Sequence, residues 1–460
     1  MTKKDTLTAG GCPFARFFAR FAPGSHAQYH AKRELTAGDL IKNALTTRHS
    51  PFSVEAIQDP YLRHRLLRQE HGRDGKPARM VWNYDPSWAR GFWEVLDSEL
   101  IRRIAKNHEA FSSEPSVSGA YVPPLTATAR PLIAMDGSIH VDKKKSVTSA
   151  FRTDQVEEWE PVAKEIGIGQ LEAIHKRSTG TFEAMSDLAI PIPIKVICAV
   201  LGIDYNDQSV QEVRDLTYDA VAFLGGDGGR FIDRKDYFYE TRQAALLSFV
   251  QREIDTKRAT PDDTLLSKIV KMKDGVKTGT PDLGIIVDIS LLLFAGNVTT
   301  TNLIGQCFRY LAQYPETQQR VRKDYKLLIP FIEEILRLES PAQGSYRAAT
   351  TDIEIDGVPI KAGELVYLNW GAAGRDPRKY VNPERFDLDR EDKKHDSFGY
   401  GKHFCIGDKL ARMEAKVTLE ETLRQTSDIS FSEGHSIETV KYLDLAIFRG
   451  PEQVMLQYTR

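Results

Sequence analysis

Long uninterrupted hydrophobic runs are missing from this sequence. In its 460 residues the most apolar stretch, 283–295, is broken by Asp288. No stretch therefore reaches the roughly 18 uncharged apolar residues that indicate a membrane-spanning helix. No continuous apolar segment follows the first five residues, so no signal peptide is expected either. These absences predict a cytoplasmic protein without a transmembrane segment.

Cysteine is scarce, and neither sign of charge is in excess. The four cysteines are too few and too scattered for a disulfide framework, and no Cys-x-x-Cys pair suggests zinc. Lys and Arg number 62 against 64 Asp and Glu, so the net charge is −2. This balance argues against nucleic acid as the main partner. A hydrophobic share of 41% and a charged share of 27% are ordinary for a globular protein.

The hydrophobic patterning predicts a mainly α-helical protein with a smaller β-rich region. Residues 283–314 are the most apolar helix candidate, and a second strong helix runs through 331–338. Amphipathic helix dominates 154–273, where prolines and a glycine cluster interrupt it. Alternating segments at 353–357 and 365–368 predict a hairpin-rich sheet.

No internal repeat or linker divides the sequence, so residues 51–460 are expected to form a single domain. Residues 1–50 are expected to be a peripheral N-terminal extension. They include the aromatic and basic run 14–21, which has a helical stripe. This run is either a segment that packs on the body of the protein or a helix that binds a membrane surface or a partner.

Residues 398–407, Phe-Gly-Tyr-Gly-Lys-His-Phe-Cys-Ile-Gly, carry the decisive motif. Its glycines allow tight backbone conformations and the close approach of a flat ligand. Cys405 directly precedes a predicted helix, whose N-terminus stabilises a thiolate. A lone cysteine is more often a small buried hydrophobe. The surrounding glycines, with Phe398 and His403, favour instead an axial ligand for iron.

This segment resembles the haem-binding loop of cytochrome P450s at every fixed position of the pattern Phe-Gly-x-Gly-x-His-x-Cys-x-Gly. Leu410-Ala411-Arg412 continues the resemblance. The resemblance implies the cytochrome P450 fold around haem b, with the Cys405 thiolate as the axial iron ligand. Phe398 and Gly399 are then cofactor-binding residues. Such a thiolate favours cleavage of the O–O bond.

Residues 295–300, Ala-Gly-Asn-Val-Thr-Thr, resemble the oxygen-binding groove of the family's long central helix. The resemblance implies that Gly296 and Thr299 are catalytic and that Thr299 hydrogen-bonds the oxygen or an attendant water. The alternative is a threonine that bonds back to a carbonyl one turn earlier. Val298 stands where the family usually has Asp or Glu, which puts the usual acid–alcohol proton relay in doubt.

Two further segments resemble the family. His140 and Lys144 share one helical face, as in the segment that binds haem propionates, although Arg is usual at the lysine position. Arg347 and His403 resemble further propionate contacts. The remaining match is structural: Glu334 and Arg337 resemble the Glu-x-x-Arg helix, and Arg385 the third member of that network.

The resemblance implies a monooxygenase that inserts one atom of dioxygen into an apolar small molecule. Electrons are expected from a ferredoxin and its reductase, with Lys402 and Lys409 as docking charges or merely solvated lysines. The substrate pocket is expected near 113–130, Phe223, Leu292 and 342–346. Val298 also leaves open a peroxygenase or an oxidative coupling enzyme. A non-catalytic haem sensor is a third reading.

Overall fold

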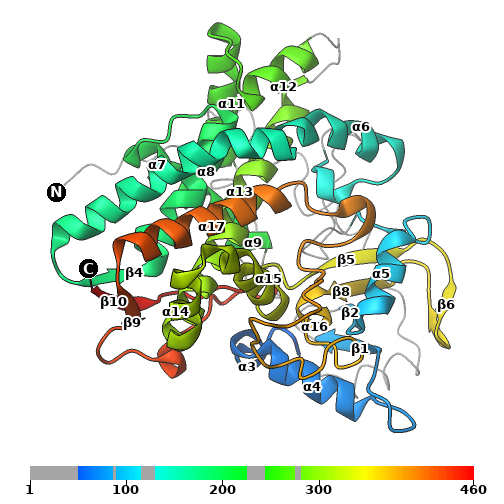
Figure 1. Ribbon diagram of the computed structural model, residues 1–460. Helices are drawn as coiled ribbons and strands as arrows, with labels where there is room; N and C mark the ends of the chain where they lie inside the picture. The colour runs from blue at the N-terminus through cyan, green and yellow to red at the C-terminus, as the bar shows by residue number, and fades with distance from the viewer. Residues whose placement is uncertain (1–49, 86–89, 115–129, 225–243, 275–280, 460) are drawn as a thin grey trace, which may run out of the picture.

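The computed structural model describes residues 50–459 apart from 86–89, 115–129, 225–243 and 275–280. It divides into a large helical part and a smaller part built on a β-sheet, as the patterning predicted (Figure 1). The aromatic and basic run 14–21, the glycine cluster, the side chain of Phe223 and most of the loop 113–130 lie outside the described residues.

The largest sheet has five strands in the order β1-β2-β8-β5-β3, with β2 and β8 parallel and the other pairs antiparallel. Its strands are β1 (Met80–Asp85), β2 (Arg90–Val95), β3 (Phe111–Ser112), β5 (Gly344–Ala349) and β8 (Leu365–Asn369). A hairpin joins β6 (Ile353–Ile355) to β7 (Val358–Ile360), close to the expected segment. The second sheet contains β4 (Thr181–Glu183), β9 (Asp428–Phe431) and β10 (Met455–Thr459).

The helices account for most of the described chain. They are α3 (Val54–Gln58), α4 (Pro60–Glu70), α5 (Ser98–Lys106), α6 (Gly137–Thr148), α7 (Thr153–Arg177), α8 (Pro191–Leu201), α9 (Asp207–Leu224), α11 (Ala244–Ala259), α12 (Leu265–Asp274), α13 (Pro281–Gln313), α14 (Pro315–Lys323), α15 (Leu328–Leu338), α16 (Trp370–Ala373) and α17 (Asp408–Gln425). Pro191 and Pro315 each open a helix, where a missing N–H costs nothing.

Helix α13 runs through the centre of the helical part and packs against α8, α9, α11 and α17 (Figure 1). By length and composition the segment Asp282–Gln313 could cross a membrane, with a mean hydropathy of 1.8. However, 61% of the apolar 18-residue window within this segment is buried inside the protein, as is usual for a core helix. Its hydrophobicity is therefore accounted for by packing.

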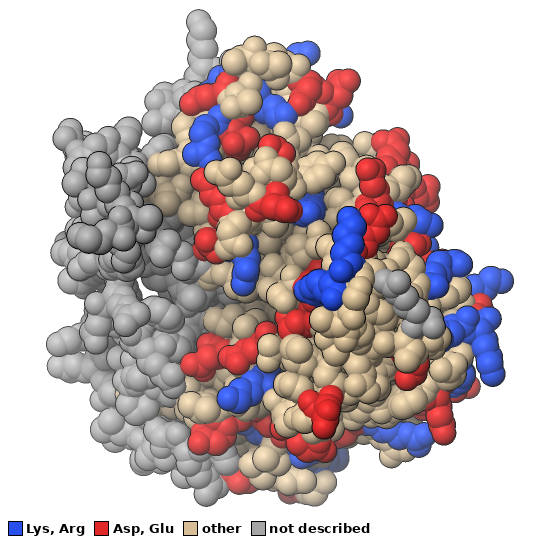
Figure 2. Space-filling view, turned by 90° about the vertical axis from the view of Figure 1, so that its left-hand side faces the viewer, with Lys and Arg blue, Asp and Glu red and all other residues tan. Residues whose placement is uncertain are grey.

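Charged side chains of both signs are intermixed on the described part of the face in Figure 2. This distribution agrees with the near-neutral net charge of the sequence.

A buried ion-pair network joins α15 to the segment that precedes the Cys405 loop. The Arg337 guanidinium donates to both oxygens of Glu334 at 2.8 Å, and neither side chain is exposed. The second cation on Glu334 is Arg390, whose Nε lies 3.1 Å from Oε1. The prediction of Arg385 was wrong, because that residue contributes its backbone carbonyl, which accepts from Arg337 and Arg390, while its side chain is exposed.

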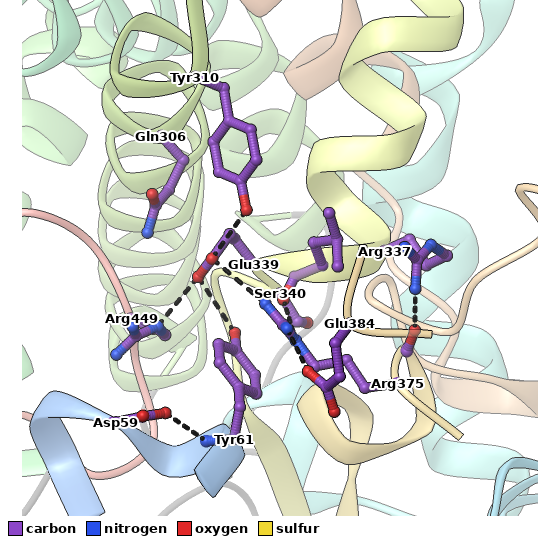
Figure 3. A network of polar contacts seen from close by, with 12 residues as sticks. Asp59, Tyr61, Gln306, Tyr310, Arg337, Glu339, Ser340, Arg375, Glu384 and Arg449 are labelled. Carbon is purple, nitrogen blue, oxygen red and sulfur yellow. Dashed lines mark hydrogen bonds and ion pairs between the residues drawn. The ribbon is translucent and has the colours of Figure 1, made fainter. Parts of the chain in front are cut away.

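A second network surrounds Glu339, just after α15 (Figure 3). Its carboxylate pairs with Arg309 at 3.1 Å, Arg375 at 3.4 Å and Arg449 at 3.0 Å. The hydroxyls of Tyr61 and Tyr310 also donate to it. The three guanidinium groups hold the pKa of the buried Glu339 carboxyl down at about 2, against the opposing effect of burial. The network fastens α4, α13 and the C-terminal segment to the end of α15.

Replacing Arg390 with alanine should lower the free energy of unfolding by about 2 kcal/mol, because the buried Glu334 loses a charge-assisted partner. Arg385→Ala is the matched control, since the Arg385 side chain is exposed and its carbonyl survives the change. Thermal unfolding of both variants measures the difference. Equal melting temperatures would mean that Arg390 does not stabilise this region.

Candidate functional site

The loop before α17 is held in shape by its glycines. Gly399 has φ +74° and Gly401 has φ +76°, a backbone region that side chains rarely adopt. A Cβ on Gly401 would also lie 2.9 Å from the carbonyl oxygen of Ala105 in α5. The loop closes on itself through hydrogen bonds from the Cys405 N–H to Phe398 O at 2.9 Å and from the Phe404 N–H to Gly401 O at 3.0 Å. The pattern of glycines therefore has a steric reason.

Cys405 keeps accessible surface although protein atoms surround it. Burial is the main effect, and with Asp408 it raises the pKa of the thiol to about 11. The N–H of Gly407, Arg412 and Lys144 act in the opposite direction. The helix N-terminus alone thus does not make a thiolate at neutral pH. A bound metal cation, which deprotonates a coordinating thiol outright, would supply what is missing.

Phe398 is fixed by a charged side chain from α17. The Arg412 guanidinium lies 4.3 Å from the Phe398 ring centroid, a cation–π contact. Arg412 in turn pairs with Glu333 at 2.6 Å, and His395 lies 3.2 Å from the same carboxylate. These two partners hold the pKa of Glu333 at about 2. The ring that opens the loop therefore has little freedom to move.

Helix α6 meets the loop through His140 and Lys144. The His140 and His403 rings lie 4.2 Å apart, centroid to centroid. Burial is the largest effect, and with the electrostatic effects of His403 and Lys144 it lowers the pKa of His140 to about 4, so its ring is neutral at pH 7. The Lys144 ammonium donates to the carbonyl oxygens of Lys402 at 2.6 Å and Phe404 at 3.1 Å. Both side chains thus contact the loop, but Lys144 is hydrogen-bonded to the backbone of the loop.

Sequence reasoning missed Asp136, the residue before α6. One oxygen of Asp136 lies 3.6 Å from His403 Nε2, and the other accepts from Ser112 Oγ and the Ser113 N–H. These donors hold the pKa of the Asp136 carboxyl well below its usual range, although burial opposes them. Its position directly before the start of α6, four residues before His140, was a signal that could have identified it.

Arg347 is a buried cation without a contact ion pair in the described residues, and the Asp136 carboxylate acts on it only through space. On β5, its side chain donates to Ser345 Oγ at 3.3 Å and to the Tyr346 carbonyl at 2.7 Å. It makes no ion pair with any residue in the described ranges. Burial lowers its pKa to about 10. Because an unpaired buried charge is costly, this site suits a ligand that brings a carboxylate.

The residues present fit a haem. Arg347, His140 and His403 offer nitrogen donors for propionates, and Cys405 offers an accessible sulfur in the same region. At Gly401 the loop backbone lies so close to α5 that a side chain would clash with the Ala105 carbonyl. These donors therefore fit a flat, carboxylate-bearing metal cofactor.

On α13, one stripe of side chains is accessible while the neighbours are buried. Ala295 is exposed and Gly296 and Thr299 are half-buried, at spacings that share one helical face. The Thr299 hydroxyl donates to Ala295 O at 2.9 Å, which is the back-bonding geometry that the sequence left open. A Cβ on Gly296 would lie 3.1 Å from Ile197, so this glycine also lets α8 pack closely.

Val298 points away from this stripe into an apolar cluster. It is 1% exposed and packs with Phe294, Tyr346 and Phe448, among others. The neighbouring Asn297 is also committed elsewhere, since its Nδ2 donates to Thr217 Oγ1 at 2.7 Å. The side chains beside Thr299 therefore carry no acid toward the accessible stripe.

The comparisons with known proteins agree with this site. The family model "Cytochrome P450" matches residues 90–452. Cytochrome P450 109 of Bacillus spizizenii is 33% identical over 351 residues, covering 75% of this chain and 81% of that protein. The vitamin D(3) 25-hydroxylase of Pseudonocardia autotrophica is 29% identical over 409 residues, covering 88% and 95%.

The crystal structure of CYP109E1 from Bacillus megaterium in complex with testosterone is similar in fold. It superposes with a TM-score of 0.76 at 28% identity and covers 88% of this chain and 99% of that one. Fold and family thus confirm the resemblance read from residues 398–407. The chain belongs to the cytochrome P450 family of haem-thiolate monooxygenases, oxidoreductases that use dioxygen and electrons from redox partners.

Proposed function

We propose that this protein binds haem b with Cys405 as the axial thiolate ligand and inserts one oxygen atom into an apolar small molecule. The observation that carries the proposal is the exposed Cys405 in the loop that precedes α17, two residues after His403, whose ring contacts His140. His140, Arg347 and His403 receive the propionates, and Phe398 and Gly399 shape the loop against the cofactor. Residues 51–460 form the single domain that houses it.

Bound haem supplies the activation of dioxygen. Cys405 contributes electron density through its sulfur. Thr299 Oγ1 donates to Ala295 O, so its lone pairs remain available to accept a hydrogen bond from water. Rotation about the Cβ–Oγ1 bond redirects the hydroxyl proton toward the accessible stripe. Thr299 thus positions a water and passes a proton at its Oγ1, with no help from Val298.

The apolar character of the substrate is supported by one exposed residue and by two relatives. Ala295 is exposed on the same face of α13 as Thr299, whereas Leu292 is buried in the helical core. One relative is named a vitamin D(3) hydroxylase, and another was crystallised with testosterone. Both names point to apolar, polycyclic molecules, and we propose an apolar substrate on that basis.

Electrons are proposed to come from a ferredoxin and its reductase in the cytoplasm. Lys402 and Lys409 are exposed beside Cys405 and offer positive charge to an acidic partner. Each also has a local contact, Lys402 Nζ with His108 at 2.5 Å and Lys409 Nζ with Thr153 Oγ1 at 2.5 Å. Docking therefore competes with these contacts.

A second candidate function is a peroxygenase or an oxidative coupling enzyme of the same fold. The observation that favours it is Val298, which is sealed in the apolar cluster and offers no proton. A peroxygenase draws its oxygen from peroxide and does not need that supply. Product formed from peroxide as fast as from reductant would favour it. A non-catalytic sensor would show no substrate-dependent oxygen consumption.

The reduced, carbon monoxide-bound protein should absorb at about 450 nm, the signature of thiolate ligation. Cys405→His should abolish this band while haem binding remains possible, because imidazole is also an iron ligand. Cys307→Ser, a change of a buried cysteine on α13, is the control. An imidazole-like spectrum in the wild type would overturn the assignment of Cys405.

Thr299→Ala should uncouple the reaction. Oxygen and reductant are still consumed, but peroxide replaces the oxygenated product, because the hydroxyl that positions water is gone. Thr299→Ser, which keeps the hydroxyl, is the matched control. The measurement is product formed per reductant oxidised. Coupling that stays at the wild-type level in Thr299→Ala would show that α13 does not deliver protons, and the peroxygenase would become the better proposal.

Val298→Asp should lower the free energy of unfolding by several kcal/mol at pH 7, since it buries an unpaired carboxyl among apolar side chains. Burial raises the pKa of that carboxyl in the folded state above its unfolded value of about 3.9. The folded protein then holds the proton more tightly, so stability falls as pH rises through the window between the two values.

Val298→Asn is the control for the preceding variant, because it has the same shape and no titration. Its melting temperature should be lowered without the added pH dependence. Parallel pH profiles for the two variants would show that position 298 is wetter than its 1% exposure indicates.

A further inference from the structure

One face of α6 is directed at a three-residue stretch of the Cys405 loop. Asp136, at the N-terminal cap of α6, is followed by His140 and Lys144 at intervals of four residues. Residues at this spacing share one side of a helix. All three contact residues 402–404, which directly precede Cys405.

The three contacts differ in kind. Asp136 and His140 contact the His403 ring, through a carboxylate–imidazole distance of 3.6 Å and a ring contact of 4.2 Å. Lys144 instead donates hydrogen bonds to the backbone on either side of His403. Its Nζ lies 2.6 Å from Lys402 O and 3.1 Å from Phe404 O. The ammonium therefore bridges two carbonyls that would otherwise present unpaired partial negative charge beside the sulfur.

The chemistry of lysine suits this bridge. A compact ammonium has three donors and can serve two carbonyl oxygens at once. The planar guanidinium that is usual at this position of the family matches a carboxylate instead. Hydrogen bonds from a charged donor are also about twice as strong as neutral ones. At position 144, lysine thus has the better geometry for binding two backbone carbonyls, whereas arginine would have the better geometry for binding a propionate.

We propose that Lys144 is a positioning residue for Cys405: its ammonium clamps the carbonyls of Lys402 and Phe404 and fixes the sulfur in place. This inference rests on the proposed function, in which Cys405 ligates the haem iron. It departs from the propionate contact that the family resemblance implies for this position. Carboxylate binding is left to His140, His403 and Arg347.

Two consequences follow from the clamp. The loop is held at the residue before Cys405, so the sulfur–metal bond is protected against displacement. The positive charge near the sulfur also favours the state that carries one more electron, which raises the reduction potential.

The test compares Lys144→Met and Lys144→Arg with Lys145→Met in the purified holoenzyme. Lys145 is the matched control, because it is the next residue, carries the same charge and is 75% exposed. The readouts are the reduction potential, the rate at which the carbon monoxide complex converts from the band at about 450 nm to the form without thiolate ligation, and the resonance Raman bending modes of the propionates.

Lys144→Met should convert several-fold faster than wild type and have a lower reduction potential, with propionate modes unchanged. Lys144→Arg should convert faster but keep the potential, because it keeps the charge and loses the clamp. Lys145→Met should match wild type. If Lys144→Met does not retain haem, the Lys144→Arg variant decides by its conversion rate and propionate modes.

Propionate modes that shift in the Lys144 variants, as they should in His140→Phe, would overturn the clamp and restore the carboxylate contact. Conversion rates equal to those of Lys145→Met would overturn it as well. A wild-type complex that lacks the band at about 450 nm would overturn the ligand assignment of Cys405, and the clamp with it. The failures of the two proposals are therefore distinguishable.

Discussion

The ten residues from Phe398 to Gly407 contain only one short turn of helix, so their conformation depends on the elements around them. Two internal hydrogen bonds and two left-handed glycines set the turn itself. Its placement is determined from outside, by the backbone of α5 at Gly401 and by α6 at residues 402–404. Everything proposed for the sulfur of Cys405 follows from this external fixation.

The buried charge networks also help to fix the position of the Cys405 loop, although they lie farther from it. Glu334, Arg337 and Arg390 bind the segment 374–390 to α15, and that segment leads directly into the loop. Glu339 fastens the other end of α15 to α13 and to the C-terminal segment (Figure 3). Removing one partner from such a network leaves a buried charge uncompensated, which is far more costly than the pair's net contribution. The networks therefore specify the position of α15 more than they add stability.

The sequence predicted what depends on local geometry. The glycines of the loop and the apolar run of α13 are of this kind, because φ requirements and helix periodicity are readable residue by residue. It failed for Arg385, because two arginines five residues apart are equivalent until the path of the chain is known. The Glu339 network was not predicted at all, since its partners come from four distant segments.

The site shows the same limit on a smaller scale. Motif matching placed Lys144 and Thr299 at the cofactor, yet it did not give the acceptor of Lys144 and left two partners open for Thr299. The structure gives both a backbone carbonyl, Phe404 O for one bond of the ammonium and Ala295 O for the hydroxyl. A donor committed to a backbone carbonyl holds its side chain in one rotamer, and it must break or share that bond before it can serve a ligand.

Because of Val298, it matters whether the Thr299 hydroxyl is bonded to Ala295 O or is free to serve a ligand. With an acid at this position, Thr299 could remain bonded to Ala295 and still receive a proton from its neighbour. With a buried valine there, and with Asn297 bonded to Thr217, the hydroxyl of Thr299 is the one polar group that residues 297–299 can turn toward the accessible stripe. Proton supply then depends on water and on the exchange of a single hydrogen bond. The proposed clamp on the loop suits the proposed function, because slower proton delivery would lengthen the time for which a bond between Cys405 and the metal must hold.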